Sequence, residues 1–225
     1  MSYHKNCTFD FPCGYLAIAL IVLCVGCSRE NQKAIDQQEF SSAIEKCKAG
    51  HANRLHFWGK KIDDTDVAKL TELSELYELG LAFTEITNAS METIAKIPGL
   101  VKLDLAGVQI DDKGLGPLRD HPTLKRIVLN ETKISNAGLA IVATIPNLEC
   151  LELYHCFITD ADCKYIGMMK NLEIISLDST AVSDKGLPFL YPLKNLKRLQ
   201  VRDTRVSDEG KKALLSKLPD VDLPP

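Results

Sequence analysis

A hydrophobic pattern repeats every 24 residues along most of this chain, with no insertion or deletion. The first position of the unit is leucine from the second unit to the seventh: Leu76, Leu100, Leu124, Leu148, Leu172 and Leu196. The fourth and sixth positions are also apolar in all seven units, and a spacing of two is typical of a short strand with one buried face. The sequence therefore predicts seven similar strands between residues 52 and 219.

The second half of each unit predicts a turn followed by a short capped helix. An isoleucine or valine ends the turn, and good N-cap residues follow it: Asp63, Thr87, Asp111, Ser135, Thr159, Ser183 and Ser207. The next position is an aspartate in five units and an asparagine in two, where a helix N-terminus favours negative charge. We interpret these recurrent aspartates as helix-capping residues and not as catalytic ones.

No single unit of this kind can bury its own apolar face, so the units are expected to stack and share one core. Parallel strands lie about 4.8 Å apart, whereas packed helices need about 10 Å. The mismatch bends the stack and places the strands on its concave side. The sequence thus predicts an α/β solenoid.

The unit length and the opening L-x-x-L-x-L resemble the leucine-rich repeat family, over residues 52 to about 219. The block from Leu172 to Leu187 is similar to a variant common in secreted bacterial proteins. The block from Leu148 to Cys163 is also similar to the cysteine-containing repeats of F-box proteins, but an export signal argues against a cytosolic ubiquitin-ligase role. The resemblance implies a horseshoe-like slab that acts as a non-catalytic protein-binding scaffold.

Residues 1–26 are predicted to be a signal peptide. The apolar stretch Tyr15–Gly26 is shorter than the roughly 20 residues of a membrane-spanning helix. The segment Leu23–Ser28 resembles a bacterial lipoprotein signal, which implies that Cys27 is lipidated and that the protein is exported and anchored in the cell envelope, facing the periplasm or the surface. Cys24 departs from the usual pattern, which places leucine there. A simply cleaved signal and a retained anchor remain alternatives.

The segments beside the repeats are expected to cover the ends of the stack. Residues 27–51 form a linker and a capping helix, in which Asn31–Lys48 is amphipathic, with these apolar positions: Ala34, Ile35, Phe40, Ala43, Ile44 and Cys47. Residues 220–225 form a C-terminal tail, where Val221 and Leu223 could add a last edge strand.

The third, fifth and seventh positions of each unit are expected to point away from the core, onto the concave face. There the sequence predicts a partner-binding patch with an apolar centre and a charged rim: Val128, Cys150, Tyr154 and Ile174, with Arg126, Glu152, Asp178 and Arg198. Trp58 is either a second contact or, as we favour, a residue packed under the N-terminal helix. Scattered exposed apolar residues are the alternative explanation of the patch.

Charge and residue type narrow the possible partners. The net charge is −3, from 27 basic and 30 acidic residues, so no basic surface for nucleic acid is expected. Mixed charges on the concave face suit a protein or peptide. A metal or redox site built from Cys150, His155, Cys156 and Cys163 is a less favoured alternative, because the three cysteines diverge in the repeat: Cys150 toward solvent, Cys156 in the turn, and Cys163 under the helix. Buried cysteine that acts as a small hydrophobic residue is the favoured interpretation. We predict no cofactor and no catalytic residue; a structural spacer without a specific ligand is the other possibility.

Overall fold

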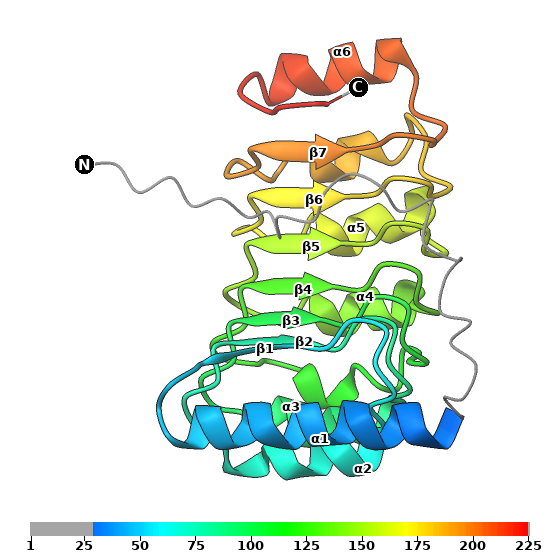
Figure 1. Cartoon of the computed structure of the whole chain (residues 1–225). Helices are drawn as coiled ribbons and strands as arrows, with labels where there is room; N and C mark the ends of the chain where they lie inside the picture. Colours follow the sequence, from blue (N-terminus) through cyan, green and yellow to red (C-terminus); the bar gives the residue numbers. More distant parts are fainter. Residues whose placement is uncertain (1–28, 225) are drawn as a thin grey trace.

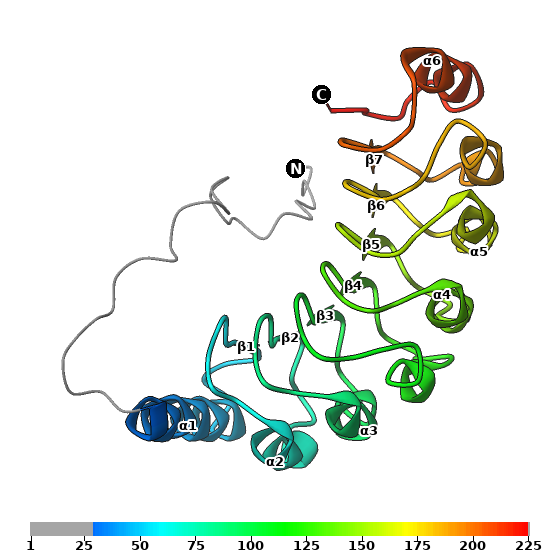
Figure 2. The ribbon, with the colours of Figure 1, turned by 90° about the vertical axis from the view of Figure 1, so that its right-hand side faces the viewer.

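A computed structural model describes residues 29–224, which form a curved solenoid (Figures 1 and 2). Its seven strands form one parallel sheet in chain order: β1 (Arg54–His56), β2 (Glu78–Gly80), β3 (Lys102–Asp104), β4 (Arg126–Val128), β5 (Cys150–Glu152), β6 (Ile174–Ser176) and β7 (Arg198–Gln200). Each strand pairs with the next at an offset of 24 residues, so that Leu55 lies beside Leu79 and Ile127 beside Leu151. The predicted parallel sheet and its register are confirmed.

The sheet lines the inner side of the arc and the helical segments lie outside it (Figure 2). The leucine columns fill the space between these two layers and are almost fully buried; Leu79, Leu129 and Leu153 are 0% exposed. They belong to one apolar core that runs from Phe40 to Val221. Curvature therefore leaves the inner face of the sheet as a concave surface supported by a packed core.

The helical segments of the repeats are shorter and tighter than the sequence predicts. They are α2 (Asp64–Val67), η1 (Ala68–Glu72), η2 (Asn88–Ser90), α3 (Met91–Ala95), η3 (Gly116–Leu118), α4 (Asn136–Val142), η4 (Asp160–Asp162), α5 (Cys163–Ile166), η5 (Leu187–Leu190) and α6 (Asp208–Lys217), where η denotes a 3-10 helix. The third and sixth units have only 3-10 turns, and each of these turns contains a proline, Pro117 or Pro188. Proline lacks the backbone N–H that a continued α-helix requires.

The recurrent aspartates link neighbouring units, a role that the capping interpretation did not include. The carboxylate of Asp64 accepts hydrogen bonds from the Thr87 N–H (2.9 Å) and the Thr87 hydroxyl (2.7 Å) of the next unit. The same pair of bonds recurs further along the chain: Asp112 with Ser135, Asp160 with Ser183, and Asp184 with Ser207. Each link satisfies one backbone donor and fixes the spacing of two consecutive turns.

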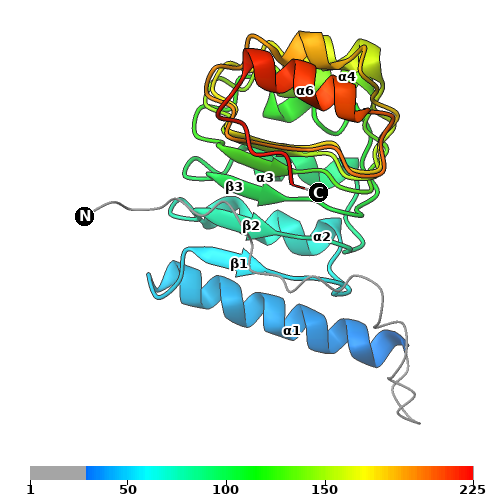
Figure 3. The same cartoon turned by 90° about the horizontal axis from the view of Figure 1, so that it is seen from above.

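Helix α1 (Arg29–Lys48) covers the open side of the first repeat (Figure 3). The C-terminal half of α1 packs through apolar side chains, with the Phe40 and Phe57 rings 4.7 Å apart. The prediction is wrong for Ala34 and Ile35, which are exposed, whereas Asp36 is 1% exposed. The helix is therefore apolar along only half of its contact with the repeat.

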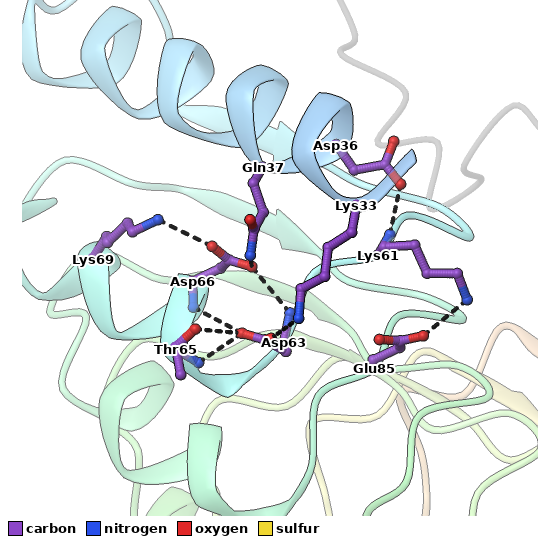
Figure 4. A network of polar contacts seen from close by, with 9 residues as sticks. All are labelled: Lys33, Asp36, Gln37, Lys61, Asp63, Thr65, Asp66, Lys69 and Glu85. Carbon is purple, nitrogen blue, oxygen red and sulfur yellow. Dashed lines mark hydrogen bonds and ion pairs between the residues drawn. The ribbon is translucent and has the colours of Figure 1, made fainter. Parts of the chain in front are cut away.

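A polar network holds the N-terminal half of α1 (Figure 4). Asp36 accepts a hydrogen bond from the Lys61 N–H (2.8 Å), which belongs to the first repeat. The Gln37 amide donates to Asp66 (3.0 Å), and Lys33 donates to Asp63 (2.6 Å). These three contacts bring buried or half-buried carboxylates into the seam, where hydrogen bonds offset their loss of water.

At the other end, the chain after α6 makes a bridge to β7 and not the predicted edge strand. Asp222 donates its N–H to Lys197 O (2.8 Å) and accepts from Leu199 N–H (3.0 Å), while Val221 is buried. The predicted signal peptide and Cys27 lie outside the described residues. Within residues 29–224, no helix combines the length and the hydrophobicity of a membrane span.

Candidate functional site

The inner face of the sheet presents the side chains that the sequence placed in columns. The third-position column passes from Lys102 to Arg126, Cys150 and Ile174 in adjacent strands. Hydrogen bonds continue the pairing beyond the strands, as from Gly59 N–H to Ala82 O (2.9 Å). The seventh-position residues therefore lie in register as well, along the edge where the strands end.

The predicted apolar centre of the patch is smaller than expected. Tyr154 is 41% exposed and Ile174 is half-buried, but Val128 and Cys150 are buried, at 4% and 0%. The prediction that Cys150 faces solvent is wrong: this small residue lies between Arg126 and Ile174 in the register and is fully buried. Tyr154 is the large exposed side chain that remains there.

The charged rim is paired within the chain. Arg126 is 5% exposed and contacts the Glu152 carboxylate at 2.5 Å. Asp178 accepts hydrogen bonds from the backbone N–H (2.7 Å) and Nε (3.0 Å) of Arg202. Arg198 forms an ion pair with Asp222, which continues the β7 edge (3.0 Å). These pairs alternate positive and negative charge along the described part of the face, which carries neither a basic nor an acidic stripe.

The Glu78 carboxylate lies close to basic side chains of β1 and β3. Its carboxylate is nearly buried and lies 3.7 Å from Arg54 Nε, 3.7 Å from Lys102 Nζ and 3.5 Å from His56 Nε2. Burial lowers the pKa of His56, with the neighbouring Glu78 opposing that shift. The imidazole is therefore neutral at physiological pH. The charged basic side chains near Glu78 are Arg54 of β1 and Lys102 of β3.

Asp104, at the end of β3, is, like Glu78, an inner-face carboxylate that the sequence analysis did not single out. It accepts a hydrogen bond from the Ala106 N–H (3.0 Å), and no basic side chain among residues 29–224 lies within ion-pair distance of it. Burial raises the pKa of Asp104 to about 6, and the carboxylates of Glu152 and Glu78 add to the shift. The only sequence signal is its place in the fifth-position column, beside Gly80.

Trp58 is exposed and does not pack under α1, so the packing that we favoured is wrong. It is 55% exposed and its ring meets Phe83 edge-on, with centroids 5.6 Å apart. Phe57, the preceding residue, packs against Phe40 of α1 instead. An exposed tryptophan on a concave face is a typical anchor for a partner.

Phe83 packs on a small apolar cluster that is separate from the main core. This cluster consists of Ala82, Ala106 and Val128, all buried. Phe83 has a φ of 57°, in the same position of the unit as Gly59 and Gly107, which also have positive φ. A Cβ at Gly107 would overlap the Phe83 ring, so only a glycine at this position leaves space for the ring. The sequence analysis missed Phe83, because the eighth position is not part of the strand pattern.

The cysteines behave as small buried residues. Cys156 Sγ lies 3.1 Å from Leu129 O, the carbonyl to which the Thr132 hydroxyl also donates, and burial raises the pKa of Cys163 to about 12. The prediction that Cys156 and Cys163 are buried is confirmed. In the part of the chain that the structure describes, no three potential metal ligands gather.

A groove of about 550 Å³ runs beside the inner face, along the turns of the last four units. Its walls include Glu131, Lys133, His155 and Arg205, and Phe157, which is 77% exposed. Mixed charges line it, as on the inner face.

Comparisons with known proteins agree with this architecture. Neither a protein-family model nor a curated protein sequence matches the chain. Among solved structures, internalin C2 of Listeria monocytogenes is similar, with a TM-score of 0.61 and 26% identity over 77% of this chain and 72% of the internalin. The internalin inlF of the same organism has a TM-score of 0.58 at 20% identity, over 79% of this chain and 55% of its own.

A leucine-rich-repeat protein of Leptospira interrogans is similar as well, with a TM-score of 0.54 at 18% identity, over 80% of this chain and 50% of its own. The chain thus spans about half of the last two proteins. Together with the seven-stranded parallel sheet, these likenesses show a leucine-rich-repeat fold.

Proposed function

We propose that this leucine-rich-repeat solenoid is a non-catalytic scaffold that binds a partner protein or peptide on the inner face of its sheet. The observation that carries the proposal is the pair of exposed aromatic side chains, Trp58 and Tyr154, on a concave face whose strands pair in constant register. Tryptophan and tyrosine are enriched among the residues that dominate binding energy.

The surrounding charges support a protein partner over a polyanion. The ion pairs of Arg126 with Glu152 and Arg202 with Asp178 leave an alternation of signs and no continuous basic stripe. A phosphate backbone requires such a stripe, whereas protein interfaces accept mixed polar rims. Because the core and these pairs fix the face before binding, little conformational entropy opposes association.

The test is a double variant, Tyr154→Ala with Ile174→Ala, compared with Phe189→Ala in η5 as a matched exposed aromatic on the outer side of the stack. Cross-linking in the native cell followed by purification should recover one stoichiometric partner with the wild type and the control, and lose it with the double variant at an unchanged melting temperature. Equal recovery by the double variant would remove this patch. The absence of any stoichiometric partner would favour a structural spacer.

We also propose that the protein is exported and anchored in the cell envelope through a lipid on Cys27. The sequence from Leu23 to Ser28 supports this, as does the short apolar stretch before it. Cys27→Ser should release the mature protein from the membrane fraction or leave the precursor uncleaved. Unchanged membrane association and processing would exclude lipidation, and complete release of the wild type would indicate a simply cleaved signal.

A further inference from the structure

We infer that the N-terminal half of the inner face binds a lysine or arginine side chain of the partner, with its charged group on Asp104 and its stem against Trp58 and Phe83. This inference rests on the proposed function and adds the chemistry that the partner must present. We call these three residues and Ala106 the basic-side-chain site.

The first argument is the state of Asp104. The other carboxylates of the inner face, Glu78, Glu152 and Asp178, each lie within 4 Å of a basic side chain. Asp104 accepts one backbone hydrogen bond and has no such partner among the described residues. A half-buried carboxylate without a cation is costly for the chain itself, so an external cation would gain more there than at a compensated neighbour.

The nearby cations are held by other residues. Lys102 precedes Asp104 by two positions, but its ammonium lies 3.7 Å from Glu78. Arg126, on the next strand, is buried in its pair with Glu152. Arg126 therefore offsets the burial of Asp104 only in part, and neither basic side chain lies within ion-pair distance of it.

The second argument is the apolar surface beside this carboxylate. Ala106 follows Asp104 by two positions on the same face, and Val128 pairs with Asp104 in the register. Phe83 packs on this small cluster, and the exposed ring of Trp58 meets it edge-on at 5.6 Å. A carboxylate next to fixed aromatic rings is complementary to a side chain with an apolar stem and a cationic end.

Lysine and arginine have that combination. Their methylene stems pack on apolar surface while the charged end reaches a polar group. An exposed indole adds a cation–π contribution, and a charge-assisted hydrogen bond to a carboxylate is stronger than a neutral one.

The experiment uses a displayed library of random peptides about 12 residues long, selected on the full chain. Selected peptides should carry a lysine or arginine, and replacing that residue by an uncharged analogue should weaken binding at least about tenfold. Asp104→Asn and Trp58→Ala should each cause a similar loss. Asp220→Asn, which makes the same change at an exposed site outside the inner face, should bind the peptides as the wild type does.

Peptides without a basic residue, equal binding by Asp104→Asn, or no selected peptide at all would each overturn the inference. The melting temperature of Asp104→Asn shows whether a loss reflects binding, because removing this buried charge should not unfold the chain. Peptides that are lost with Tyr154→Ala and Ile174→Ala, yet bind Asp104→Asn normally, would overturn the inference and leave the proposed function standing.

Discussion

The position of Asp104 in a repeated strand changes the acidity of its carboxylate. Burial raises its pKa from 3.8 to about 6, so the folded chain binds this proton more tightly than the unfolded chain does. The contribution of this one group to stability is then most favourable below about pH 4, falls as the pH rises through about 6, and is least favourable once the group is ionised. The charged side chains that act on it from other strands are Glu152, Arg126 and Glu78.

Asp104→Asn should therefore raise the free energy of unfolding near pH 7 by about 1–3 kcal/mol, since one pKa unit corresponds to about 1.4 kcal/mol. Urea unfolding near pH 7 and near pH 4 measures the change. The gain should vanish near pH 4, where both chains are neutral at this position, and Asp220→Asn should show no gain at either pH. Equal stability of Asp104→Asn and wild type near pH 7 would contradict the raised pKa.

Individual residues also show what the sequence could not predict. The period gives the direction of each inner-face side chain, and these directions agree with the observed register. It does not give coverage by neighbouring side chains, and therefore Cys150 and Val128 were expected at the surface but are buried. The position of the Trp58 ring depends on its contact with Phe83, and the position of Phe83 depends on Gly107. Both contacts require backbone geometry that the hydrophobic pattern does not contain.

At the scale of the element, the link between consecutive units depends on one carboxylate per unit. Asp64 accepts bonds from the N–H and hydroxyl of Thr87, and the Ser90 hydroxyl also donates to it. These hydrogen bonds act against burial and lower the pKa of Asp64. Asp208 holds the same position in the seventh unit, but its carboxylate is 84% exposed and faces Lys211 at 3.9 Å.

Asp64→Ala should thus destabilise the chain by about 1–3 kcal/mol, because the Thr87 N–H loses its acceptor in a partly buried place. Asp208→Ala should cost less than about 0.5 kcal/mol. Both residues lie at a helix N-terminus, so the difference between them isolates the link between units. Chemical unfolding measures both values; similar losses would mean that the aspartates act only on the helix dipole.

The sequence predicted the strands better than the helices for a physical reason. Alternating burial fixes a strand even when it is three residues long, as in β1 and β3. The short helical segments on the outer side have few hydrogen bonds of their own, so the curvature of the stack determines their conformation. In two units the segment is a 3-10 turn, η3 or η5. Asp36, by contrast, breaks the apolar pattern of α1 because the first repeat offers it polar partners.

For the whole molecule, the shared core makes each unit depend on its two neighbours. Leu153 is 0% exposed and lies in the middle of the array. Leu153→Ala should cost about 2–5 kcal/mol, because fixed strands on both sides prevent the cavity from closing. Tyr154→Ala, at the adjacent exposed residue, should cost less than about 1 kcal/mol and serves as the control. Urea unfolding measures both, and a loss under about 0.5 kcal/mol for Leu153→Ala would place that residue outside a packed interior.

The place along the sheet where Leu153→Ala lowers stability tests the architecture more sharply than the size of the loss. In a stack where units contact only their neighbours, a cavity under β5 weakens its interfaces with β4 and β6 first. Amide exchange in Leu153→Ala should therefore accelerate most at Ile127, Leu151 and Ile175, and least at Leu55, near α1. Uniform acceleration along the sheet would instead mean that the chain opens only as a whole. In that case the rigidity that we assign to the inner face would be a property of the entire arc and not of adjacent units.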